Sequence, residues 1–151
     1  MTQDKRSRLA GMPGASIRGV AAAMTMTGMR SLTADLGLIE ATPPEIVVGR
    51  RASHLLERLP AERRKAVLVL MHWAYGAGGG AIFAVCPDRL RQAPWAGPLF
   101  GLALWLGFEA LLDPALGLKW HRRGSMTERT TLAADHLLYG AVLAGFRRRP
   151  D

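Results

Sequence analysis

The stretch GPLFGLALWLGFEALLDPAL fills positions 97–116 and decides the fold class that this sequence predicts. An α-helix needs about 20 mostly apolar residues to cross the hydrocarbon core of a membrane. Three more stretches, at 14–36, 66–86 and 131–146, are also mostly apolar and of about this length, so they too predict membrane-crossing helices. We therefore expect an all-α protein built as a bundle of four transmembrane helices.

Two acidic residues in the 97–116 stretch limit how it can insert. Ten Leu and Phe residues from Leu99 to Leu118 favour insertion by about −3 to −6 kcal/mol, whereas Glu109 and Asp113 each cost about +2.5 to +3.5 kcal/mol near the centre. Because these contributions nearly cancel, Glu109 should be neutral, paired with Arg30 or a histidine, or close to the headgroups. Asp113 precedes Pro114 and should mark the end of the helix.

Basic residues surround the apolar stretches and give the chain a net charge of +8. They fall in a basic segment at 1–13, in the connectors and in a basic tail at 147–151. This placement indicates contact with anionic lipid headgroups and argues against nucleic-acid binding. Lys and Arg residues outside the stretches number eight on one predicted side and ten on the other, so the positive-inside rule assigns no topology.

The first stretch and the connector after it are the least regular parts of the prediction. The stretch 14–36 carries Arg18 and Arg30 and few large apolar residues, so it should be held by close packing on neighbouring helices. The connector contains Thr42-Pro43-Pro44-Glu45, a typical helix start. Apolar residues then recur at helical spacing, which predicts an amphipathic helix at about 44–59 lying in the membrane interface. A soluble connector packed on the bundle is the alternative.

Two of the stretches share a short motif. Residues 72–77 read HWAYGA and residues 136–141 read HLLYGA. The match favours a duplicated helical hairpin, related by an axis along the membrane normal, although Ala and Gly are frequent enough to permit a chance match. Two G-x-x-x-G pairs, Gly76 with Gly80 and Gly97 with Gly101, are expected to line close helix contacts.

Ionisable residues in the stretches are predicted to share one leaflet, because successive helices alternate in direction. This polar layer contains Arg30, His72, Glu109, Asp113, Asp135 and His136, with the hydroxyls of Tyr75 and Tyr139 as supporting partners. Three interpretations are open: a structural hydrogen-bonded network, a proton or ion path, and a metal site made of His72, His136 and Glu109. The chain has no G-x-S-x-G, H-E-x-x-H or P-loop motif, so no catalytic residue or cofactor is predicted.

The order of these motifs resembles the YagU-like bacterial inner-membrane proteins. The resemblance rests on the Pro-Pro-Glu connector, the His72 to Gly76 motif, the segment 95–101 leading to Glu109, and Asp135-His136 with Tyr139-Gly140 before an arginine tail. It implies a multi-pass protein of the bacterial cytoplasmic membrane and assigns no catalytic residue. We expect a non-enzymatic accessory or homo-oligomeric component, with a proton or ion conductor as the alternative and a membrane-embedded metal-binding protein as the second alternative.

Overall fold

The computed structural model describes residues 3–37, 59–115 and 125–145. These residues form α1 (Gln3–Asp35), α4 (Ala61–Val85), the short α5 (Asp88–Arg91) and α6 (Ala96–Gly107). A π-helical segment η1 (Phe108–Leu112) and α7 (Asp113–Ala115) continue α6, and α9 (Met126–Gly145) closes the described chain. The all-α prediction is confirmed. The predicted interfacial helix at 44–59 lies outside the described residues except for residue 59. The basic tail at 147–151 lies entirely outside them.

Two helices begin earlier than the apolar pattern suggested. The helix α1 starts at Gln3 and not near residue 14, because the charged residues before the apolar stretch are good helix formers and Pro13 is accommodated inside the helix. The helix α9 starts at Met126 and not at residue 131. Its start is a capping box, in which the Ser125 amide donates to the Glu128 carboxylate at 2.7 Å and the Glu128 amide donates to the Ser125 hydroxyl at 3.1 Å.

The described part of the predicted third stretch is helical from Ala96 to Ala115. The helix therefore continues through Asp113, where the sequence predicted its end. Five of its residues, Phe108–Leu112, are π-helical. Pro114 has no amide hydrogen, so it cannot donate the backbone hydrogen bond that an α-helix would make to the preceding turn. A change from α-helical to π-helical hydrogen bonds in that preceding turn is consistent with this missing donor. Such π segments often occur at functional sites, and Glu109 lies in this one.

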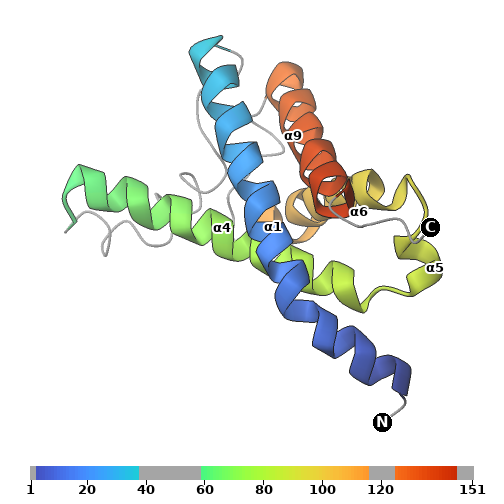
Figure 1. Cartoon of the computed structure of the whole chain (residues 1–151). Coiled ribbons are helices and arrows are strands. Elements are labelled where there is room, and N and C mark those ends of the chain that lie inside the picture. The colour runs from blue at the N-terminus through green and yellow to red at the C-terminus, as the bar shows by residue number, and fades with distance from the viewer. Residues whose placement is uncertain (1–2, 38–58, 116–124, 146–151) are drawn as a thin grey trace.

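The long helices pack as two pairs. Figure 1 shows α1 crossing α4 obliquely and α9 lying beside α6. The most extensive packing is between α1 and α4, followed by α6 with α9, and α1 also packs on α9. These contacts join the pairs α1–α4 and α6–α9 into one helical bundle.

The interior of this bundle is built largely from small side chains. The buried apolar residues are Ala15, Ala22, Ala23, Met26, Phe83, Ala84, Ala96, Leu132, Tyr139 and Leu143. Many larger apolar side chains point outward: Ile17 is 71 % exposed, Leu111 is 70 % exposed and Leu70 is 58 % exposed. Among the described residues, large apolar side chains are more often exposed than buried. This inverts the distribution of a soluble core, where large aliphatic and aromatic residues are preferentially buried.

Among the described helices, only α4 is both long and apolar enough to cross a membrane. A second apolar run, Ala96–Leu111, is shorter than that criterion requires. Helices occupy all four predicted stretches, but the number of membrane crossings stays a prediction.

Candidate functional site

The crossing of α1 and α4 depends on three glycines, Gly19 in α1 with Gly76 and Gly80 in α4. A methyl group added at Gly19 would collide with the backbone oxygen of Gly76, and one added at Gly80 would collide with the backbone oxygen of Ala15. Glycine is needed here because the two backbones touch without intervening side chains. The predicted close contact of Gly76 and Gly80 is thus made within the chain.

The crossing of α6 and α9 repeats this arrangement. A methyl group at Gly97 would collide with the backbone of Gly140, and one at Gly101 would collide with the backbone of His136. Gly140 and Gly76 hold the same place in the two H-x-x-Y-G-A motifs. Gly140 is packed against Gly97 and Gly101 on α6, and Gly76 is packed against Gly19 on α1. Two related hairpins would place the two motif glycines in this way.

A buried ion pair joins the two hairpins. The Arg30 guanidinium Nε on α1 lies 3.4 Å from Asp135 Oδ2 on α9, and their side chains are only 8 % and 1 % exposed. Arg30 also acts electrostatically on both His72 and His136. Four of the predicted polar-layer residues are therefore brought into one neighbourhood.

Glu109 belongs to a second, separate ion pair. Its Oε2 accepts a hydrogen bond from Arg129 at 2.9 Å, and the Glu109 side chain is 8 % exposed. Its other oxygen, Oε1, is buried without a hydrogen-bond partner in the described part of the chain. The expected partner was Arg30 or a histidine. Arg129 was missed because it precedes the predicted stretch 131–146, although the Ser125-x-x-Glu128 capping box signals the earlier start of α9.

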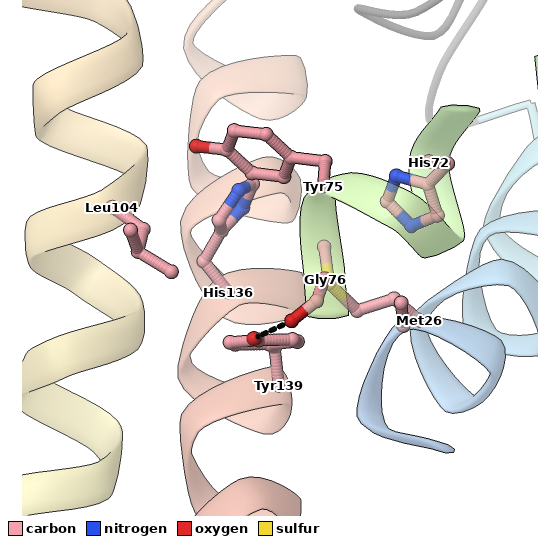
Figure 2. A pocket seen from close by; sticks show the side chains of 8 residues that line it. Met26, His72, Tyr75, Gly76, Leu104, His136 and Tyr139 are labelled. Carbon is pink, nitrogen blue, oxygen red and sulfur yellow. Dashed lines mark hydrogen bonds between the residues drawn. The ribbon is translucent and has the colours of Figure 1, made fainter. Parts of the chain in front are cut away.

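The two H-x-x-Y motifs meet around one small cavity (Figure 2). It is lined by Ala23, Met26, His72, Tyr75, Gly76, Leu104, His136 and Tyr139, which come from α1, α4, α6 and α9. Its volume is about 10 Å³, close to the least that holds one water molecule. The cavity is too small for an organic substrate.

Hydrogen bonds fix most of the polar groups at this cavity. The Tyr139 hydroxyl donates to the Gly76 carbonyl oxygen at 2.7 Å, from α9 across to α4. His136 Nδ1 lies 2.8 Å from the Leu132 carbonyl oxygen, so this nitrogen carries the ring proton in the neutral imidazole. The backbone of Ala23 is a hydrogen-bond partner of His72, whereas His72 Nε2 is buried and has no partner among the described residues. Tyr75 is 42 % exposed and does not repeat the contact made by Tyr139.

The residues predicted for a metal site are divided between these two places. His72 and His136 line the cavity, while Glu109 binds Arg129. Within the described residues, no group of three or more His, Cys, Asp or Glu side chains is arranged to hold a metal ion. The side chain of Asp113 lies outside the described part of the structure.

Comparisons with known families, with curated proteins and with solved structures each found no match to this chain.

Proposed function

We propose that this protein is an integral component of a bacterial cytoplasmic membrane that acts through helix association and not through catalysis. The observation that carries the proposal is the inverted distribution of side chains. Glycine, alanine and paired charges occupy the helix crossings, while most of the large apolar residues that the structure describes face outward. Lipid tails solvate outward Leu and Ile residues, and small residues allow helices to pack closely where no hydrophobic effect drives them together.

The helix α4 gives the most specific support for a lipid environment. Only 22 % of its most apolar 18-residue window is buried by the rest of the protein. A core helix of a soluble protein with this composition would be mostly covered, because large exposed apolar surfaces are disfavoured in water. Outward residues of α4 include Leu70, Met71, Ile82 and Val85.

Paired charges allow the remaining helices to lie in the membrane beside α4. An isolated charge in hydrocarbon is costly, and residues of this kind usually pair with one another inside a bundle. Arg30 is paired with Asp135, and Glu109 with Arg129. These pairs support the four-span arrangement for α1, α4, the α6–α7 segment and α9.

Two outward faces keep small residues that suit association with further helices. Ala74 and Gly78 lie one turn apart on α4, and a methyl group added at Gly78 would meet no atom within 4 Å. Ala103 and Gly107 have the same spacing on α6, with open space around Gly107. We propose homo-oligomers or complexes with other membrane proteins, with anionic lipids at the basic connectors and no role for nucleic acid. The YagU-like resemblance agrees with this assignment.

Extraction with alkaline carbonate tests membrane integration. Washed membranes from cells that express the protein should retain it, as they retain integral proteins. Recovery of the protein in the supernatant would reject the proposal. A peripheral protein of the same membrane, followed in the same samples, shows that the wash was effective.

The oligomeric part of the proposal has its own test. Gly78→Leu adds bulk to the open face of α4 and should leave the monomer folded while reducing the oligomer mass measured in detergent. The matched variant Gly80→Leu adds the same bulk at the α1 crossing and should unfold the monomer. If Gly78→Leu keeps the wild-type mass and stability, the face of α4 around Gly78 takes no part in assembly.

A further inference from the structure

Arg18 in α1 carries a charge that the described helices do not balance. Arg30 is paired with Asp135, and Glu109 with Arg129. Arg18 forms no ion pair with any residue that the structure describes, and its Nε is buried there without a hydrogen-bond partner. A guanidinium has five N–H donors and a permanent positive charge. Inside a membrane such a group requires an anion nearby.

Packing on α4 fixes the depth of Arg18 in the proposed membrane domain. Ala15 lies against Gly80 of α4. Ala23 lies against Gly76, one turn earlier in α4, so the two helices run in opposite directions where they cross (Figure 1). Arg18 is therefore near the level of Gly80. The N-terminal half of α1 runs toward the same membrane surface as the C-terminal end of α4.

The Arg18 side chain points toward that membrane surface. A methyl group added at Gly14 would lie 3.8 Å from Arg18 Nη1, so the guanidinium lies over Gly14. Gly80 is six residues from the end of the apolar stretch at Cys86, a distance of about 9 Å along the helix, and the reach from Arg18 to Gly14 covers about 6 Å of it. The charge is thus held just below the level of the headgroups, as is common for arginine near the end of a membrane helix.

The helix face in front of this guanidinium is open. Gly11, Gly14 and Arg18 recur at helical spacing and share one face of α1. A methyl group added at Gly11 would meet no atom within 4 Å, so no helix in the described part of the chain covers this place. Three more basic residues occur in α1 between Gln3 and Arg8, nearer the same membrane surface. A negatively charged group can therefore approach Arg18 from the headgroup side.

We propose that Arg18, with Gly14 and Gly11 beside it, binds the phosphate group of an anionic phospholipid. The inference rests on the proposed membrane embedding of α1. A guanidinium binds phosphate through two parallel N–H···O bonds, and glycine at both neighbouring positions leaves room for a headgroup. A second copy of the chain does not fit this face, because a symmetric contact along it would bring two unpaired guanidinium groups together.

Native mass spectrometry of the full chain in detergent tests the proposal, by titration with phosphatidylglycerol or with phosphatidylcholine of the same acyl chains. The wild-type protein should bind its first phosphatidylglycerol about fivefold more tightly than phosphatidylcholine, the factor that corresponds to about 1 kcal/mol for one basic residue at a membrane surface. Arg18→Gln should abolish this preference. Arg18→Lys should keep part of it, because lysine retains the charge and lacks the planar fork of donors.

Matched variants separate this site from general effects of bulk and charge. Gly14→Leu places bulk beside the guanidinium and should reduce the preference for phosphatidylglycerol. Gly28→Leu adds the same bulk to α1 where a methyl group meets no atom within 4 Å, and it should leave the preference unchanged. Arg63→Gln removes the same charge from an exposed position on α4 and should also leave it unchanged. Circular dichroism of each variant identifies any that has lost helical structure, and Gly14→Leu provides the test if Arg18→Gln has.

Three outcomes would overturn the proposal. A wild-type protein without the preference would leave the counter-charge of Arg18 to an acidic side chain of another membrane protein. Equal losses in Arg18→Gln and Arg63→Gln would show that lipid binding follows net charge alone. Displacement of the bound lipid by inorganic phosphate would assign the site to an anion from the aqueous phase. Carbonate extraction is a separate measurement, so a chain that resists extraction but lacks the preference rejects this site and leaves the membrane assignment intact.

Discussion

Replacing Gly80 with alanine tests the helix packing on which the fold depends. The new methyl carbon would lie 3.2 Å from the Gly19 Cα and closer still to the Ala15 carbonyl oxygen. These are backbone atoms, so α1 must move as a whole to relieve the collision. Overpacking of this kind costs about 1–3 kcal/mol. Against it stands the helix propensity of alanine, which exceeds that of glycine by about 1 kcal/mol.

Gly78→Ala is the control because it makes the same chemical change two residues away. Its methyl group meets no atom within 4 Å, so the propensity gain of about 1 kcal/mol should appear alone. The free energies of unfolding of the two variants should therefore differ by the overpacking term, about 1–3 kcal/mol, with Gly80→Ala the less stable. The assay is reversible unfolding in mixed detergent micelles, followed by far-ultraviolet circular dichroism. Equal stability of the two variants would refute the close α1–α4 crossing.

The polar contacts give three further predictions. Asp135→Asn should lower the free energy of unfolding by about 3–5 kcal/mol, because it removes the charged carboxylate from a buried ion pair with Arg30. A loss near zero in the same unfolding assay would contradict the contribution of this pair. Glu109→Gln should lower the free energy of unfolding by only about 0.5–1.5 kcal/mol, since its partner Arg129 is 36 % exposed and can be solvated. A decrease as large as that of Asp135→Asn would contradict the weaker contribution of the Glu109–Arg129 pair. Tyr139→Phe removes the hydrogen bond to the Gly76 carbonyl and should cost about 0.5–1.5 kcal/mol, while Tyr75→Phe, measured alongside it, should be nearly neutral; equal losses would exclude a special role for Tyr139.

The helical class and the glycine contacts follow directly from the sequence. Apolar stretches of about helix length and the pairs Gly76–Gly80 and Gly97–Gly101 were sufficient, because only glycine allows two backbones to approach so closely. The shared motif also pointed to equivalent roles for Gly76 and Gly140. Helix ends were harder to place, since α1 and α9 extend into charged segments whose residues form helix well without contributing apolar pattern.

The partners within the polar layer could not be assigned from the sequence alone. Depth along each helix placed Arg30, His72 and Asp135 in one leaflet, and the structure brings them together. Depth does not determine the direction in which a side chain points around the helix axis. Glu109 binds Arg129 and not Arg30 or a histidine. Arg129 lies in a part of α9 that the apolar pattern assigns to a connector, so the sequence did not suggest it as a partner. The cavity between the two motifs likewise depends on how four helices meet, which no local pattern encodes.

The most direct test of the membrane assignment measures what surrounds the outward apolar side chains. Cys86 is the only cysteine, so Cys86→Ser gives a background in which a spin label can be attached at Ile17, Leu70, Ile82 or Leu99, all exposed residues on three helices. In reconstituted bilayers each label should be more accessible to oxygen, which dissolves in lipid, than to a water-soluble nickel complex. Labels at Ile17, Ile82 and Leu99 that all prefer the nickel complex would show that these faces contact water, and would contradict a membrane-embedded bundle.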